Sequence, residues 1–371
     1  MELYMARTAR ELARRGHSVL PIIHPDAAVL RPVLAESGLT PREWRVGVAE
    51  LPLLSARRFA RLLDAEGVEA VHAHTRRDLP LAALAKRFSR SRPRLVYTSQ
   101  MKISQSKNDP YHRFIYGQVD ALLTITAQLR EQTRARMPPF LRDRVRLLYY
   151  GAEPARRLDD AERAALRERY GLRPDAFTVG LFGQKHEGKG QHLLVEALGR
   201  LRAEGVVVQG LLVGPETESG IGERLRARLR ALGLTDAVRL EDFVPEPQAL
   251  MQLCDVCVLA TYQETFGLVL IEAMSVGVAV IGSDAGGVPE IIAPGETGLL
   301  FETRNADSLH DALRRLHDDP ALRERLARAG ERQAAERFSL ASHYDELEAI
   351  LRGEWPPEAV PPQIHAAPPS R

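Results

Sequence analysis

Apolar and polar positions alternate in two patterns along most of this chain of 371 residues. Short runs rich in Val, Leu and Ile have the length of buried strands, and the longer segments between them have the period of amphipathic helices. This alternation predicts an α/β fold of parallel sheets with helices on both faces. The runs predicted as strands begin at His17, Ala70, Arg94, Asp120, Val145, Phe177, Val206, Val238, Asp255 and Val278.

The chain is longer than one ordinary domain of about 100–200 residues, so we expect two domains. A polar helical stretch between turn signals, residues 151–177, interrupts the alternation and predicts the junction. We therefore predict two Rossmann-like domains that face each other across a cleft, residues 1–152 and 153–338, followed by a helix over 339–352. The remaining residues, 353–371, are rich in proline and predict a mobile tail.

The first residues, MELYMARTARELARRGHSV, have an amphipathic helical pattern with no strand before it. A doubly wound sheet normally begins with its central strand. Without that strand, the neighbouring strands would keep unpaired backbone groups. We expect that the first strand of the N-terminal domain is missing from this sequence and that the natural chain begins upstream of Met1.

The composition, 44% apolar and 27% charged residues, is typical of a soluble globular protein. The sequence contains no apolar run of the roughly 18 residues that suggest a membrane-spanning helix. Met1 is not followed by the charged region, apolar stretch and cleavage site of a secretion signal. We expect a cytoplasmic protein.

Charge is distributed unevenly, because residues 1–150 contain 26 Lys and Arg against 14 Asp and Glu, a net +12, and the rest carries −10. This favours contact of the N-terminal part with an acidic membrane surface or a phosphorylated acceptor, with solvated arginines as the alternative. The basic segment 76–94, RRDLPLAALAKRFSRSRPR, predicts either peripheral contact with a membrane that holds a lipid-linked acceptor or a solvated helix face. We expect no nucleic-acid partner.

Two residue pairs raise the question of a metal site. Cys254 and Cys257 are the only cysteines, and their C-x-x-C spacing is compatible with a redox pair or half a zinc site. Both fall in a buried strand pattern without a second ligand pair, so we predict small core residues. His72 and His74 share one strand face, but two ligands without a third do not make a metal site. We predict no metal and a cleft-lining, acceptor-side place for the histidines.

The segment FGQKHEGKG, residues 182–190, follows a predicted strand and precedes a predicted helix. Glycines at such a junction let backbone N–H groups approach a phosphate, and the helix N-terminus adds partial positive charge. The spacing from Gly183 to Lys189 imitates the P-loop of ATPases, but Gly190 stands where a magnesium-binding hydroxyl is needed. Only five of the 51 basic residues are lysines, and Lys185 and Lys189 both lie in this loop. We interpret Lys189 as a point charge for a diphosphate.

The segment ETFGLVLIEAMSVGVAVIGSDAGG begins with Glu264, just past a predicted strand, where open α/β sheets bind ligands. Glu272 lies eight residues later in an apolar helical pattern, where a buried carboxylate requires a partner. A carboxylate has two acceptor oxygens, which suit the two hydroxyls of a vicinal diol. The two acids therefore predict contacts to a ribose and a sugar, with an arginine partner for Glu272 as the alternative.

This pattern resembles the retaining glycosyltransferases of family 4, which have the two-domain GT-B fold. The resemblance covers most of the chain and rests on Glu264-Thr265-Phe266-Gly267, Glu272-Ala273-Met274, Gly277, Val280, Gly286-Gly287, Pro289-Glu290, Gly298, the loop from Gly183 to Lys189-Gly190, and LARRGHSV near the start. It implies a nucleotide-diphosphate sugar as donor and a glycan or lipid-linked acceptor. It implies a catalytic role for Glu264 and Lys189 and donor binding by Gly183, Gln184, Lys189, Thr265, Phe266, Gly267, Leu268 and Glu272.

In the mechanism that this resemblance implies, Glu264 contacts sugar hydroxyls, Glu272 holds the ribose, and Lys189 neutralises the departing diphosphate. Transfer retains the anomeric configuration and needs neither a metal nor a cofactor. Two positions depart from the family pattern. Gln184 replaces an arginine that would share the diphosphate charge, and we expect Lys185 to compensate or affinity to drop. Gln100 replaces a histidine after the strand that begins at Arg94, and with His74 it is an acceptor-side candidate.

Two other functions remain compatible with the same residues. A nucleotide-sugar epimerase on this fold would consume the donor without an acceptor. A non-catalytic sugar-nucleotide binder would fit the missing first strand and Gln184.

Overall fold

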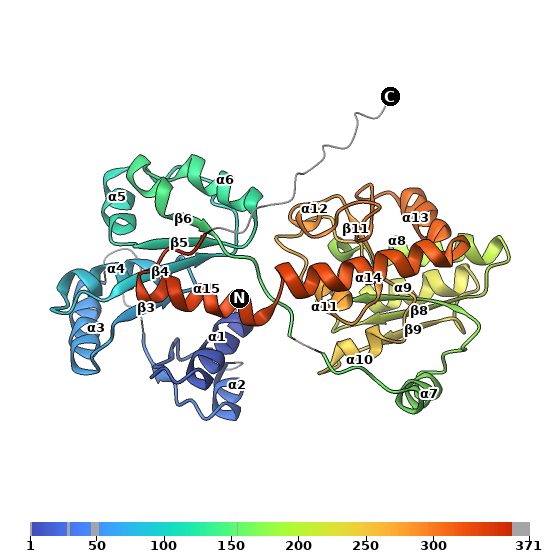
Figure 1. Cartoon of the computed structure of the whole chain (residues 1–371), viewed down its shortest axis with the longest axis horizontal. Helices are drawn as coiled ribbons and strands as arrows, with labels where there is room; N and C mark the ends of the chain where they lie inside the picture. The colour runs from blue at the N-terminus through green and yellow to red at the C-terminus, as the bar shows by residue number, and fades with distance from the viewer. Residues whose placement is uncertain (1, 28–29, 46–51, 154, 358–371) are drawn as a thin grey trace. The chain divides into compact units, whose positions relative to one another are not determined.

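The computed structural model describes residues 2–27, 30–45, 52–153 and 155–357, and the chain divides into two compact units (Figure 1). The first unit comprises Met1–Tyr149 and Ala341–Ala359, and the second comprises Tyr150–Leu340. The chain therefore passes between the units twice. The last helix, α15 (Leu340–Arg352), is grouped with the first unit although it comes last in the sequence.

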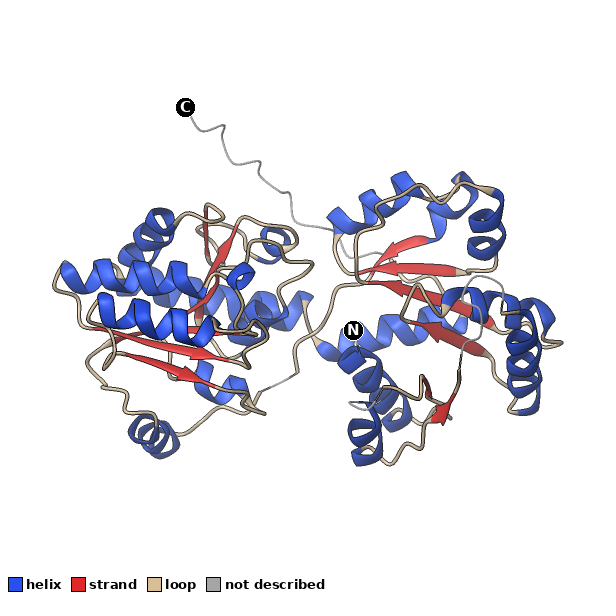
Figure 2. Ribbon diagram, turned by 180° about the vertical axis from the view of Figure 1, so that it is seen from behind, coloured by secondary structure: helices blue, strands red, loops and turns tan. Residues whose placement is uncertain are grey.

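The first unit contains a four-stranded parallel sheet with the order β3-β4-β5-β6. Helices and short loops alternate with these strands, as Figure 2 shows in blue and red. The bounds are α1 Glu2–Arg14, β1 Ile22–Ile23, α2 Leu30–Glu36, β2 Arg42–Glu43, α3 Leu53–Ala65, β3 Ala70–Ala73, α4 Leu79–Phe88, β4 Arg94–Ser99, α5 Pro110–Gly117, β5 Ala121–Thr124, α6 Ala127–Arg136, η1 Pro139–Arg144 and β6 Val145–Leu147.

Strands β1 and β2 pair only with each other, over two residues each. Among the described residues, neither is bonded to β3, so the first unit has two sheets where a single doubly wound sheet was expected. The predicted helix at the start is confirmed as α1. The strand predicted from His17 is shorter than expected, since only Ile22 and Ile23 form β1. That a further strand precedes Met1 stays a prediction.

Most of the apolar residues in the basic segment 76–94 lie on helix α4. Every residue from Leu79 to Ala85 is buried in the core of the first unit. The apolar residues of α4 from Leu79 to Ala85 therefore pack inward, whereas Phe88 at its end is exposed. Arg76, Arg77 and Arg87 remain exposed to solvent.

The second unit contains a six-stranded parallel sheet with the order β12-β11-β10-β7-β8-β9. The bounds are α7 Asp160–Arg169, β7 Phe177–Phe182, η2 Glu187–Lys189, α8 Gln191–Ala203, β8 Val208–Val213, α9 Ile221–Ala231, β9 Val238–Glu241, α10 Pro247–Met251, β10 Val256–Leu259, α11 Leu268–Ser275, β11 Ala279–Ser283, α12 Val288–Ile291, β12 Leu299–Phe301, α13 Ala306–Asp318 and α14 Pro320–Arg337. The predicted α/β fold with parallel sheets is confirmed. The three-residue strand β12 was not predicted, because it is too short to give a periodic signal.

The strand order reverses between β7 and β10. From β7 the sheet continues through β8 and β9 on one side, and through β10 to β12 on the other. In open α/β sheets, ligands bind at the carboxyl ends of the strands beside such a switch point. We therefore expect a ligand-binding site at the loops after β7 and β10.

The chain beyond α15 lies against the first unit for a few residues. The Trp355 ring contacts the guanidinium groups of Arg94 and Arg146, each 5.3 Å from its centroid. The rest of the predicted tail, residues 358–371, lies outside the described residues. No described helix is long and apolar enough to cross a membrane.

His343 of α15 is buried within the first unit, with an exposed fraction of 4%. Its Nδ1 lies 2.6 Å from the Tyr149 carbonyl oxygen, and its Nε2 lies 3.1 Å from the Tyr4 hydroxyl. A neutral ring satisfies both contacts, because Nδ1–H donates to the carbonyl and Nε2 accepts from the hydroxyl. Burial lowers the pKa of His343 to about 4.

We predict that stability falls as the pH drops from about 6.5 to about 4, because His343 takes up a proton more readily in the unfolded chain than in the folded one. One such group changes the free energy of unfolding by up to about 1.4 kcal/mol per pH unit. The variant His343→Gln should therefore show a shallower loss of stability than the parent over this range. Urea unfolding at several pH values measures the free energy of unfolding of both proteins. If it falls equally steeply with pH in the parent and in His343→Gln, the role given to His343 is wrong.

Candidate functional site

The loop after β7 is held against the end of β10 by backbone contacts. The Tyr262 N–H donates to the Gly188 carbonyl at 2.8 Å. Gly190 has φ +70°, and a Cβ on it would lie 2.1 Å from the Ala260 carbonyl oxygen. Glycine is needed here both for the left-handed backbone and for the close approach. These contacts fix Lys189, which lies between the two glycines.

The structure brings the two predicted catalytic residues together. The Lys189 ammonium lies 2.8 Å from a carboxylate oxygen of Glu264, and their side chains are 26% and 20% exposed. The other carboxylate oxygen accepts a hydrogen bond from the Thr265 N–H at 3.1 Å. A cation and an anion therefore meet at the switch point while remaining accessible to a ligand.

The turn that carries Glu264 is fixed by a second glycine contact. The Gly287 N–H donates to the Glu264 carbonyl at 3.0 Å. A Cβ on Gly286 would lie 1.8 Å from the same carbonyl oxygen. The Gly286-Gly287 pair of the motif therefore lets the loop after β11 approach the loop after β10, which sets the direction of the Glu264 side chain.

Lys185 does not compensate for Gln184, contrary to one expectation from the sequence. Its side chain is buried, with the residue only 2% exposed, and its ammonium donates to the carbonyls of Gly214 and Glu241. Burial lowers the pKa of Lys185. Lys185 thus joins the loops after β7, β8 and β9, whereas Gln184 is exposed and accepts a bond at its carbonyl from Gln191.

The segment Thr265–Leu268 forms the turn into α11. Gly267 precedes the helix with φ +109°, so the motif glycine occupies a left-handed position. Phe266 is 3% exposed and packs edge-on against Tyr150 at 5.4 Å and Phe338 at 6.0 Å between ring centroids. The predicted backbone donors are therefore supported by a buried aromatic cluster.

Glu272 lies on the second turn of α11, as the sequence predicts, but its side chain is half-buried and not buried as expected. Leu268, its neighbour one turn earlier, is also half-buried and begins the helix. Gly183 follows β7 directly, with φ +151°, and opens the loop that carries Lys189. Their predicted contacts to a donor remain predictions.

Tyr262 was not singled out from the sequence. Its hydroxyl lies 2.6 Å from His192 Nε2, and the Arg304 guanidinium lies 4.6 Å from its ring centroid. The Tyr262 N–H also donates to Gly188, so its backbone supports the lysine loop, while its side chain contacts His192 of α8, the helix that follows this loop. Its place two residues before Glu264, at the end of a strand, is the signal that points to it.

The acceptor-side candidates belong to the first unit. The rings of His72 and His74 are 4.1 Å apart, so the two side chains share a face as predicted. Burial lowers the pKa of His74 to about 4, which leaves its ring neutral near pH 7. The buried atoms His74 Nδ1 and Gln100 Nε2 have no hydrogen-bond partner in the part of the chain that the structure describes. The hydrogen-bonding capacity of these two nitrogen atoms is therefore not used by the described residues.

Cys254 and Cys257 are buried free thiols, in agreement with their interpretation as core residues. A hydrogen bond with Cys257 and burial raise the pKa of the Cys254 thiol. Within residues 2–27, 30–45, 52–153 and 155–357, no group of three or more His, Cys, Asp or Glu side chains could hold a metal ion.

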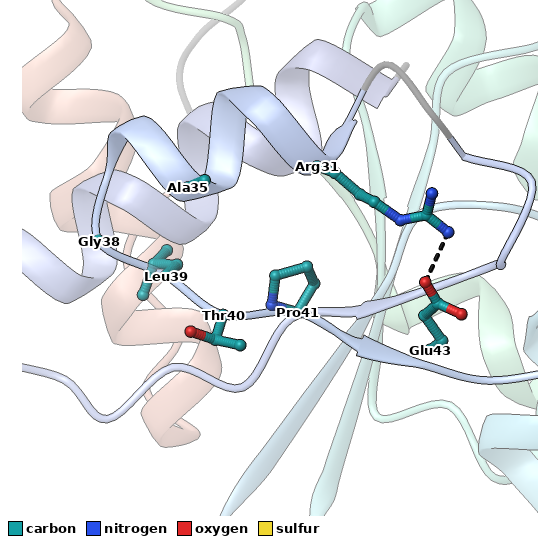
Figure 3. A pocket seen from close by; sticks show the side chains of 7 residues that line it. All are labelled: Arg31, Ala35, Gly38, Leu39, Thr40, Pro41 and Glu43. Atoms are coloured by element: carbon teal, nitrogen blue, oxygen red, sulfur yellow. Dashed lines mark hydrogen bonds and ion pairs between the residues drawn. The ribbon is translucent and has the colours of Figure 1, made fainter.

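An open hollow in the first unit contains none of the predicted site residues (Figure 3). An ion pair between Arg31 and Glu43 closes one side of it. It is lined by Arg31, Ala35, Gly38, Leu39, Thr40, Pro41 and Glu43. Because its one cation is already paired, it offers less to an anionic ligand than the loops of the second unit.

Comparison with known proteins gives matches over nearly the whole chain. Residues 1–156 match the family model described as Glycosyltransferase Family 4, and residues 162–333 match the one described as Glycosyl transferases group 1. The chain is 30% identical to a D-inositol 3-phosphate glycosyltransferase of Nocardia farcinica, over 90% of this chain and 80% of that protein. It is 33% identical to the alpha-D-kanosaminyltransferase of Streptomyces kanamyceticus, over 62% of this chain and 60% of that protein, which is less than two thirds of its length.

Solved structures match the fold. Anabaena Alr3699/HepE in complex with UDP superimposes with a TM-score of 0.82 at 20% identity, covering 95% of this chain and 96% of that one. A glycosyltransferase from Rickettsia africae gives a TM-score of 0.82 at 19% identity, covering 95% and 94%. At these identities the structural likeness shows the fold alone.

We predict that Gly190→Ala destabilises the second unit more than Gly233→Ala. Both glycines have left-handed backbones, with φ +70° and +65°, but a Cβ on Gly233 meets nothing within 4 Å. The control variant Gly233→Ala should lose about 1–2 kcal/mol of unfolding free energy from backbone strain alone. Gly190→Ala should lose about 1–3 kcal/mol more, because Ala260 must move. Denaturant unfolding measures both, and equal losses would show that the close approach is unimportant.

Proposed function

We propose that this chain, which belongs to glycosyltransferase family 4 as its motifs predicted, transfers a sugar from a nucleotide-diphosphate sugar to a glycan or lipid-linked acceptor. The observation that carries the proposal is the ion pair of Lys189 and Glu264 at the carboxyl ends of β7 and β10. Transfer retains the anomeric configuration and uses no metal ion or cofactor.

The two side chains suit the two parts of such a donor. The Lys189 ammonium neutralises charge on the diphosphate, and the Glu264 carboxylate accepts hydrogen bonds from sugar hydroxyls. Their separation of 2.8 Å means that one ligand meets both where sugar and phosphate join. The N–H groups at the start of α11 face the donor phosphates, and Glu272 holds the ribose diol. Support for a nucleotide sugar also comes from the Anabaena protein, which was solved with UDP and with UDP-glucose.

Catalysis in this proposal rests on stabilising the leaving group and orienting the acceptor. As the sugar–phosphate bond breaks, negative charge grows on the diphosphate beside Lys189. The acceptor hydroxyl attacks from the same face and passes its proton to the departing phosphate. His74 and Gln100, with unpartnered buried nitrogen atoms, are the acceptor-side candidates. A lipid-linked acceptor would bring the basic first unit to the inner face of an anionic membrane.

One observation favours a weaker alternative, a non-catalytic binder of sugar nucleotides. Gln184 lacks a charge, and the Lys185 ammonium is occupied by two carbonyl groups. Of these three loop residues, only Lys189 is left to meet a diphosphate. A screen of nucleotide sugars by thermal shift, followed by assays for transfer with and without acceptors, separates the functions. Donor binding without turnover would favour the non-catalytic binder, and an epimer formed without acceptor would favour the nucleotide-sugar epimerase.

We predict that Lys189→Ala and Glu264→Ala each lower the transfer rate about 100-fold to 1,000-fold, as expected when one electrostatic stabiliser is removed. Neither side chain is buried in the core, so the unfolding temperature should change little. Lys102→Ala, which removes an exposed lysine of the first unit, is the charge-matched control and should transfer normally. Nucleotide release measured with the donor found in the screen gives the rates. Full activity of Lys189→Ala would rule out the proposed role of the ion pair.

Glu272→Ala should act on donor binding, because its proposed contacts are to the ribose and not to the reacting bond. Loss of a bidentate contact of about 1.4 kcal/mol weakens donor affinity about tenfold. The saturating transfer rate should stay within about threefold of the parent. Titration of donor against the initial rate separates the two quantities, and a lower saturating rate at unchanged affinity would place Glu272 elsewhere.

We predict that EDTA changes the transfer rate by less than about twofold, since lysine and helix N–H groups carry out the charge stabilisation. The assay compares protein treated with chelator and protein supplemented with Mg²⁺ or Mn²⁺. Loss of transfer with EDTA and recovery with either ion would mean that the metal-free mechanism is wrong.

A further inference from the structure

The charged groups at the candidate site do not balance a diphosphate. The Lys189 ammonium already faces the Glu264 carboxylate at 2.8 Å. The Lys185 ammonium is occupied by the carbonyls of Gly214 and Glu241. A diphosphate carries more than one negative charge, so a single lysine beside an acid leaves part of that charge uncompensated. For the proposed function, the site therefore needs a further cation at the carboxyl ends of the strands.

Arg304 lies in the loop between β12 and α13, and its backbone is strained. Because β12 runs parallel to β11, this loop is at the carboxyl ends of the strands. The φ of Arg304 is +66°, in the left-handed region that favours glycine. Its neighbours fix it there, since the Thr303 N–H donates to Asp284 at 2.8 Å and the Asn305 side chain caps α13. A strained residue that is held in place by its surroundings points to a function for its side chain.

The Arg304 side chain contacts the loops of the candidate site. Its guanidinium lies over the Tyr262 ring, 4.6 Å from the centroid. The Tyr262 N–H donates to the Gly188 carbonyl, and Gly188 is followed directly by Lys189. Glu264 comes two residues after Tyr262. Arg304 is therefore placed on the residue that joins the loop of Lys189 to the loop of Glu264.

The N–H donors of Arg304 are not used within the described part of the chain. The residue is exposed, and its guanidinium forms no hydrogen bond or ion pair with the described residues. The acidic side chains of its own loop have other partners. Glu302 accepts a bond from Asn305 at 2.7 Å, and Asp307 forms an ion pair with Arg200. Contact with an aromatic ring uses none of the five donors of a guanidinium, and these donors match phosphate oxygens in geometry.

We propose that Arg304 donates to the β-phosphate of the sugar donor and is the second cation of the diphosphate site. This inference rests on the proposed function, in which Glu264 contacts the sugar. The β-phosphate is the one that carries the sugar, so it lies close to the loop that holds both Glu264 and Tyr262. A charge-assisted hydrogen bond to phosphate is stronger than an exposed contact with an aromatic ring, so the guanidinium gains by binding the ligand.

Calorimetric titration of the full chain with UDP, GDP, ADP and TDP tests the inference. With the diphosphate that binds the parent most tightly, Arg304→Gln should weaken binding about tenfold to a hundredfold, as expected for one charge-assisted hydrogen bond. The corresponding monophosphate lacks the β-phosphate, so its affinity should change less than about twofold. An equal loss for both nucleotides would mean that Arg304 only supports the loop, and the inference would be wrong.

Two further variants separate charge from backbone strain. Glycine adopts the φ of residue 304 without strain, so Arg304→Gly should be at least as stable as the parent in urea unfolding and should still lose diphosphate affinity. The matched control is Arg92→Gln, which removes an exposed arginine with φ +47° from the first unit. This control should bind the diphosphate as the parent does.

A second cation introduced elsewhere in the site should replace the first. Gln184 is exposed in the same loop as Lys189, so Gln184→Arg should restore most of the affinity that Arg304→Gln loses. Equal diphosphate affinity in Arg304→Gln and the parent would overturn this inference and leave the proposed function standing. A parent that binds none of the four diphosphates would overturn the proposed function, and the inference with it.

Discussion

The ion pair between Lys189 and Glu264 is the interaction on which the candidate site depends, and it exists because three loops come unusually close together. Gly190 lets the loop after β7 touch the end of β10, and Gly286 lets the loop after β11 touch the backbone of Glu264. Any side chain at either glycine would overlap a carbonyl oxygen. The glycines of the motif therefore allow the close approach of the loops that carry Lys189 and Glu264.

The two lysines of one loop show how position within a fold separates identical residue types. Lys185 is enclosed by carbonyl groups at the ends of β8 and β9, where its charge stabilises loop packing. Lys189, four residues later, remains accessible at the switch point. The short 3-10 helix η2, Glu187–Lys189, begins two residues after Lys185 and turns the chain, so the two lysine side chains lie in different surroundings. The local charge at the site is consequently smaller than the loop sequence suggests.

The first unit has exposed arginines and exposed apolar side chains, and the second unit has the acids Glu264 and Glu272 at the candidate site. Exposed leucine on α3 has no role in the core, whereas the equally apolar residues of α4 are needed there. Helix periodicity cannot distinguish these cases, since both helices are amphipathic.

The sequence by itself determined the α/β class and most of the strands, and it predicted the candidate site residues, because apolar periodicity, glycine positions and motif order are local properties. It also indicated that Glu264 and Lys189 belong to one site. Only the tertiary structure decided that Lys185 is buried, that Tyr262 supports the lysine loop, and that Leu54 is exposed while Leu81 is not. Each of these depends on which distant segment packs beside a residue, and that is set by the order of strands in the sheets and not by neighbours in the chain.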